Sequence, residues 1–158
     1  MKGKEKMEST NEMIHIVVYG APQGKGRPRM SKFGGVYTPA KTAAYESAVR
    51  FAAGQGMIGH SLFENPVGVK IRACFEVPES YTKKKKALAA QGQLFPAKKP
   101  DIDNIQKAVL DGCNKVVWKD DALIVKIEMT KEYSDKPRVE IDVYEMRGTD
   151  EKGQLCIL

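Results

Sequence analysis

Strand-like and helix-like hydrophobic patterns follow one another along this chain without regular alternation, and this order limits the fold more than any other feature. Apolar or alternating runs typical of strands occur early, in the middle and twice near the end, at 13–19, 67–77, 122–129 and 137–144. Helix-like patterns lie between them, after Thr38, over 80–91 and from Asp101. Because no helix separates the last two strands, we expect an α+β domain in which helices pack on a small mixed sheet.

The boundaries of several elements can be predicted in more detail. Thr38 is a candidate cap for the first helix, with Pro39 at its first position, Ala44, Ala48 and Phe51 at helical spacing, and an end near Gly54. The helix that opens at Asp101 carries one apolar stripe of Ile102, Ile105, Val109 and Cys113. The strands at 122–129 and 137–144 are expected to form a hairpin, joined by a polar turn around Ser134.

The length and composition favour one globular domain and exclude several other classes. We expect a domain at 13–146 between a flexible lead at 1–12 and a flexible tail at 147–158, since 158 residues suffice for one core. No apolar run is long enough to span a bilayer, and the charged start lacks the apolar middle of a secretory signal, which predicts a cytoplasmic protein without a membrane partner. The three cysteines are too scattered for a disulfide framework or a zinc site.

The charge is divided unevenly along the chain. Residues 1–100 hold 17 Lys and Arg against 7 Glu and no Asp, a balance of +10, whereas residues 101–158 hold 9 Lys and Arg against 13 Asp and Glu, a balance of −4. A basic body attracts polyanions, while clustered carboxylates repel phosphate unless a cation lies between them. This combination suggests a metal-dependent nuclease.

Five of the eight aspartates gather in one segment, at 99–121. Asp101 and Asp103 fall in the first turn of the expected helix, Lys107 follows Asp103 by four residues on the same face, and Asp120-Asp121 stand at the start of the next strand. If the strand start lies beside the helix start, three carboxylates meet without His or Cys, which makes a hard oxygen site suited to Mg²⁺, with Mn²⁺ as a substitute.

Such a site suits phosphodiester hydrolysis. The cation would activate water and neutralise charge on the scissile phosphate, while Lys107 would stabilise the pentacovalent state or the leaving oxygen. The competing interpretation is structural: aspartate caps helix amides, and Asp103 with Lys107 is an ordinary surface ion pair. Capping accounts for one carboxylate, but not for the second pair at Asp120 and Asp121.

Basic residues before the aspartates are candidate DNA contacts. Lys25, Arg27 and Arg29 lie on a loop that glycine and proline keep free of regular structure, and Lys98-Lys99 directly precede the carboxylates. The alternative for the loop is a solvated turn, since cationic loops are frequent on basic proteins. Phe33 and Trp118 are weaker candidates for stacking on bases, because a lone aromatic is more often part of a core or an interface.

These segments resemble a known family. KPDIDNIQKAVLDGCNKVVWKDDALIV at 99–125 is similar to the RusA-type Holliday junction resolvases, which share an Asp-x-Asp-Asn, a Lys four residues after the second Asp and a later Asp-Asp before a strand. GKGRPRM and VYTPAKTAAYE within 24–46 look like the N-terminal half of phage-encoded members. The resemblance spans about residues 14–145, and the expected fold is RusA-like.

The resemblance implies a homodimer that nicks four-way DNA junctions symmetrically with magnesium, in DNA recombination and repair. It also implies catalytic roles for Asp101, Asp103, Lys107 and Asp121, with Asp120 as an accessory metal ligand. A two-fold symmetric substrate suits two active sites related by the same symmetry. Two alternatives stay open, a nuclease specific for flaps or forks and a DNA-binding module without catalysis.

Overall fold

The protein is described here from a computed structural model, which covers residues 13–148 and Lys152. The predicted lead at 1–12 and most of the tail at 147–158 lie outside the described residues, so the predicted division of the chain stays a prediction. The elements in chain order are β1 (Met13–Tyr19), β2 (Arg29–Met30), β3 (Val36–Tyr37), α1 (Ala40–Gly56), β4 (Val67–Glu76), α2 (Lys83–Ala90), α3 (Ile102–Cys113), a 3₁₀ turn (Asp121–Leu123), β5 (Ile124–Ser134) and β6 (Arg138–Glu145). Within this part of the chain, no helix is long and apolar enough to cross a bilayer.

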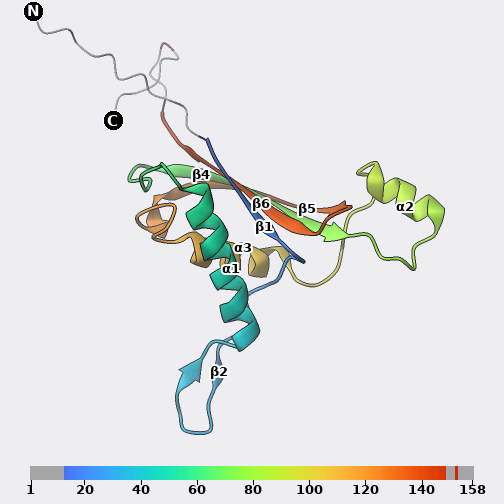
Figure 1. Cartoon of the computed structure of the whole chain (residues 1–158), viewed down its shortest axis with the longest axis horizontal. Helices are drawn as coiled ribbons and strands as arrows, with labels where there is room; N and C mark the ends of the chain where they lie inside the picture. Colours follow the sequence, from blue (N-terminus) through green and yellow to red (C-terminus); the bar gives the residue numbers. More distant parts are fainter. Residues whose placement is uncertain (1–12, 149–151, 153–158) are drawn as a thin grey trace, which may run out of the picture.

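Four strands form a mixed sheet in the order β1-β6-β4-β5, which confirms the predicted α+β class (Figure 1). β6 pairs antiparallel with both β1 and β4, whereas β4 and β5 are parallel. The predicted hairpin of the last two strands is wrong, because β4 lies between β5 and β6. β4 carries buried residues on both faces, and a central position provides it with partners along both edges. The short connection at 135–137 spans the two strand spacings, about 10 Å, without strain.

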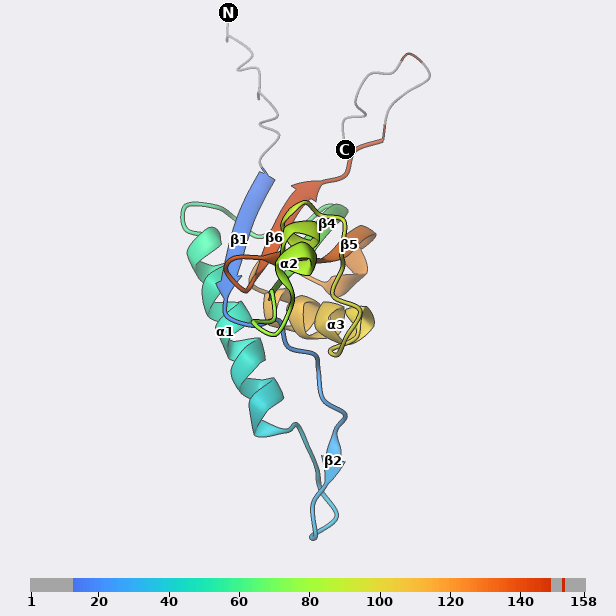
Figure 2. The same cartoon turned by 90° about the vertical axis from the view of Figure 1, so that its right-hand side faces the viewer.

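The hydrophobic core lies between one face of the sheet and the helices α1 and α3 (Figures 1 and 2). Alternate residues of β1, β4 and β6 point toward these helices, among them Ile16, Ile71 and Ile141. On α3 the predicted stripe is confirmed for Ile105, Val109 and Cys113, which are fully buried, but Ile102 is exposed. The sequence pattern therefore located the core face of α3 correctly except at its first residue.

The predicted apolar face of α1 is wrong. Ala44, Ala48 and Phe51 are exposed, Phe51 to 70%, and the helix instead buries Thr42, Tyr45, Val49 and Ala53. Contact with α3 determines which face of α1 is buried. A Cβ at Gly112 of α3 would lie 2.6 Å from the Cβ of Val49, so the two helices approach closely along the face that carries Val49. Thr38 is not the cap either, since Pro39 occupies that position and makes no side-chain cap bond.

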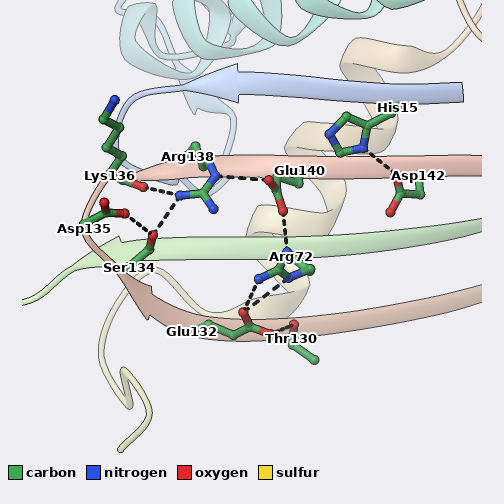
Figure 3. A network of polar contacts seen from close by, with 10 residues as sticks. All are labelled: His15, Arg72, Thr130, Glu132, Ser134, Asp135, Lys136, Arg138, Glu140 and Asp142. Atoms are coloured by element: carbon green, nitrogen blue, oxygen red, sulfur yellow. Dashed lines mark hydrogen bonds and ion pairs between the residues drawn. The ribbon is translucent and has the colours of Figure 1, made fainter. Parts of the chain in front are cut away.

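The other face of the sheet carries a network of ion pairs (Figure 3). Arg72 on β4 contacts Glu132 on β5 at 2.8 Å and Glu140 on β6 at 2.6 Å, and burial of these contacts is partial. His15 on β1 bonds Asp142 on β6. Charged pairs thus join neighbouring strands on this face, and the end of α2 lies beside Arg72 and Glu132.

Candidate active site

Asp101 and Asp103 stand at the start of α3, as predicted. Asp101 occupies the cap position with an extended backbone, but its carboxylate makes no capping hydrogen bond to the helix. It lies 3.3 Å from the Lys99 ammonium and is 53% exposed, and Asp103 is exposed in the first turn. The structural interpretation of Asp101 as a helix cap therefore does not account for its carboxylate.

The basic loop lies directly beside this helix start. One groove is lined by Lys25 and Arg27 of the loop together with Asp101, Asp103 and Lys107. The loop is bound closely to α3: the Lys25 amide donates to the Asn104 carbonyl at 2.9 Å, and a Cβ at Gly24 would lie 3.0 Å from the Cβ of Asn104. Segments about 75 residues apart in the sequence thus form the two walls of the same groove.

The three cations expected on the loop have different environments, and Arg29 lies on β2 and not in irregular structure. The Lys25 ammonium bonds the Asp111 carboxylate on α3 and lies 3.4 Å from Glu46 on α1, and the bond to Asp111 raises the pKa of Lys25. Lys25 thereby ties the loop to both helices, and its role in binding DNA stays a prediction. Arg27 and Arg29 are exposed and line the neighbouring part of the groove.

Lys98 and Lys99 lie on the segment directly before Asp101. A side chain of β5 holds this segment in place, which the sequence did not indicate. Lys131 on β5 donates from its ammonium to the Lys98 carbonyl at 2.5 Å and to the Pro100 carbonyl at 3.0 Å. The Lys131 and Lys98 ammonium groups lie 5.3 and 5.7 Å from the ring centre of Phe75. Lys131 is a supporting residue that sequence reasoning missed, since a single Lys in an alternating strand carries no signal.

Asp120 and Asp121 lie in a 3₁₀ turn before β5 rather than at the start of a strand. The Asp120 carboxylate accepts a 2.8 Å hydrogen bond from the Ala122 amide and caps this turn. The Asp121 carboxylate accepts a 2.7 Å hydrogen bond from the indole of Trp118. Trp118 is fully buried, so the suggestion that it stacks on bases is wrong and its role is to pack the core and orient Asp121.

Asp121 lies near the C-terminal end of α3. The Val117 amide donates to the carbonyl of Cys113, the last residue of α3, at 2.9 Å, and the neighbouring Trp118 holds the Asp121 carboxylate. Burial raises the pKa of the Cys113 thiol to about 12, and the negative charge of Asp121 adds to the rise. Asp101 and Asp103 are at the other end of this helix of 12 residues, about 18 Å away along its axis. Within residues 13–148, no three acidic, His or Cys side chains gather closely enough to hold a metal ion, so the predicted meeting of three carboxylates does not occur within one chain.

The donors at the start of α3 nevertheless have the chemistry of a divalent cation site. Asp101 and Asp103 are both exposed, provide oxygen ligands alone and border the same groove. Carboxylate oxygens suit Mg²⁺ or Mn²⁺ better than zinc. One chain thus brings two oxygen donors for a hard cation to the same groove, while Asp121 lies away from them.

Comparison with known proteins agrees with the predicted resemblance. The family model of the endodeoxyribonuclease RusA matches residues 20–144, which include the basic loop and all five site positions from Asp101 to Asp121. The chain is also 36% identical over 140 residues to the uncharacterized protein YqaN of Bacillus subtilis (strain 168), covering 85% of this chain and 98% of that protein. A family match over most of the chain, together with an α+β fold that joins the motif to a basic loop, shows that this protein belongs to the RusA endodeoxyribonuclease family.

Proposed function

We propose that this protein is a magnesium-dependent Holliday junction resolvase, a homodimer that nicks four-way DNA junctions symmetrically in recombination and repair. The observation that supports this best is the groove in which Asp101 and Asp103 face the cationic loop, because a nuclease needs acidic metal ligands and phosphate contacts side by side. A binding module without catalysis has no use for exposed carboxylates on its DNA surface, since they repel phosphate.

Each group in the groove has a distinct proposed role. Asp101 and Asp103 would hold the cation, which would supply an activated water and neutralise charge at the scissile phosphate. Lys107, one turn beyond Asp103, donates to the leaving oxygen or to the pentacovalent phosphate. Arg27, Arg29 and Lys99 line the groove, bind the flanking phosphates and hold the strand there. Lys98, exposed outside this groove beside Phe75, binds a more distant phosphate.

We place the third carboxylate, Asp121, in a second copy of the chain. Within one chain Asp121 lies at the far end of α3, but two α3 helices related by a two-fold axis and running antiparallel bring the end of one helix to the start of the other. Each dimer then holds two composite sites, and Asp120 beside Asp121 is an accessory ligand. This arrangement couples dimer formation to activity and matches the two-fold symmetry of the junction.

Cleavage of labelled DNA tests the substrate and the chemistry together. With magnesium, the protein should nick a synthetic four-way junction faster than a flap, a fork or a linear duplex, and should cut none of them without a divalent ion. Faster cutting of the flap or fork would favour the alternative nuclease. Asp103→Asn should abolish cleavage and leave DNA affinity equal or higher, while Asp135→Asn at the exposed β5–β6 turn serves as a control that keeps activity.

Mixing two inactive variants tests the composite site. Asp103→Asn and Asp121→Asn proteins should each be inactive, yet a mixed dimer of the two contains one intact site, so the mixture should regain about a quarter of wild-type nicking. If Asp103 and Asp121 act within one chain, every site in the mixture is defective. No recovery after subunit exchange, verified with a tagged dimer, would refute the composite arrangement but not the nuclease.

A further inference from the structure

An arm formed by residues 29–37 projects from the body of the protein (Figures 1 and 2). β2 and β3 pair with each other, Arg29 with Tyr37 and Met30 with Val36, and they form a two-stranded sheet separate from the main one. No local sequence pattern predicts this hairpin, whose two strands have only two residues each. Its base continues directly from the basic loop, since Arg27 and Arg29 line the groove beside Asp101.

The tip of the arm is an ordered turn that displays Phe33. The Ser31 amide donates to the Gly35 carbonyl at 2.7 Å, and the Ser31 hydroxyl oxygen accepts bonds from the amides of Phe33 at 3.3 Å and Gly35 at 3.1 Å. Gly34 adopts a positive φ of 82°, which glycine tolerates without strain. Phe33 is 98% exposed, so this turn holds a large apolar ring in water.

Phe33 is part of a larger exposed apolar surface. Met30, Val36 and Tyr37 on the same arm are also exposed. Single exposed apolar residues are ordinary, but four on one short hairpin indicate a surface that is covered by a partner. The charge of the surroundings identifies this partner: from Gly20 to Tyr45 the chain has five Lys and Arg and no Asp or Glu. A polyanion with apolar faces fits this surface better than a second copy of a chain with net charge +6.

We propose that the arm is a DNA-probing element whose Phe33 ring stacks against unpaired or unstacked bases at the branch point. The inference rests on the proposed function, because it requires DNA in the groove beside Asp101. Phe33 is four positions beyond Arg29, and because the chain turns between Ser31 and Gly35 their backbones lie closer than the roughly 13 Å of a fully extended segment. With Arg29 on a phosphate, the ring thus lies within about four base steps of that phosphate. Aromatic rings stack on any base, so the contact recognises disrupted stacking and not sequence.

Fluorescence of 2-aminopurine tests this contact. The base analogue is placed at the branch point of a four-way junction, and wild-type protein is added without magnesium, so that binding occurs without cleavage. Its fluorescence should rise as the neighbouring bases unstack. Phe33→Ala should abolish the rise and weaken junction binding by roughly 5- to 150-fold, the range for loss of one stacked aromatic ring. Its affinity for linear duplex should change little, and Phe33→Trp should restore both junction signals.

Phe51→Ala is the matched control, because it removes another exposed phenyl ring, on α1. A wild-type protein that does not bind DNA would refute the proposed function itself. Normal binding with equal fluorescence in Phe33→Ala and Phe51→Ala would refute the arm's role alone. Sedimentation of the free proteins provides a further outcome: dissociation of the dimer by Phe33→Ala, with the fluorescence signal retained at high protein concentration, would assign the arm to the subunit interface and overturn the proposal.

Discussion

Lys131 offers the sharpest connection between the packing of this protein and its proposed activity. Its ammonium bonds the carbonyls of Lys98 and Pro100, directly before Asp101, and thereby ties the start of α3 to β5. Lys131→Met keeps the hydrocarbon stem and removes the charge. The substitution should therefore loosen the segment that presents Asp101 without emptying the core.

The magnitude follows from the two bonds. A hydrogen bond to a charged group contributes about 1.5–3 kcal/mol, but water can replace the donor at the exposed Lys98 carbonyl. Loss of the bond to the part-buried Pro100 carbonyl is not compensated by water in this way. The free energy of unfolding should therefore fall by about 2 kcal/mol, the contribution of this one bond. For a domain of this size the melting temperature should drop by about 4–8 °C.

The substitution should also slow cleavage. Displacement of a catalytic group by about 1 Å can cost about 100-fold in rate, so we expect kcat for junction cleavage to fall by about 10- to 100-fold. The dissociation constant for the junction should stay within about twofold, because Lys131 bonds backbone carbonyls and not phosphate. Single-turnover cleavage and equilibrium binding at a temperature well below melting separate the two quantities.

Two variants complete this experiment. Lys131→Arg retains a cation with several donors and should recover most of the activity, whereas Lys126→Met removes an exposed Lys of the same strand that pairs with Glu128 and should resemble wild type. The reasoning is refuted if Lys131→Met cleaves and melts like Lys126→Met.

Three further predictions concern packing, pH and salt. Gly112→Ala should lower the free energy of unfolding by about 1–3 kcal/mol, because the new Cβ collides with α1. Gly54→Ala, which has open space around it, should raise the free energy of unfolding by up to about 1 kcal/mol. Urea denaturation measures both values. Lys25→Met should lower stability by about 1 kcal/mol at pH 8. Since the folded pKa of Lys25 is raised above 10.5, the difference from wild type should shrink as the pH rises past that value. Neutralising Arg27 and Arg29 should make the plot of log binding constant against log salt concentration less steep, by about one unit of slope for each lost phosphate contact. An unchanged slope would argue against their role in DNA binding.

Much of the secondary structure could be predicted because it depends on local patterns. The alternation in β4, the apolar stripe of α3 and the capping position of Asp101 are all visible within about a dozen residues of sequence. The face of α1 could not be predicted. Its Ala-rich sequence offers several possible apolar faces, and the close approach at Gly112 selects the one that carries Val49.

The sheet order shows the same limit. β5 and β6 are neighbours in sequence with a turn between them, a pattern typical of a hairpin. In the sheet, however, β4 lies between them, and this central position buries the strand that has apolar residues on both faces. This outcome depends on pairing between segments more than 50 residues apart. No local pattern contains that information.

By itself, the sequence determined the residue types of the site, the family resemblance, the α+β class and the positions of most helices and strands. Only the tertiary structure decided which of those residues meet: it joins the basic loop to Asp101 and Asp103, turns Lys25 inward to Asp111, supports the segment before α3 with Lys131, and keeps Asp121 at the opposite end of the helix. The physical reason is that residue type and hydrophobic period are local properties of a chain, whereas distances between side chains depend on how the elements pack around a common core.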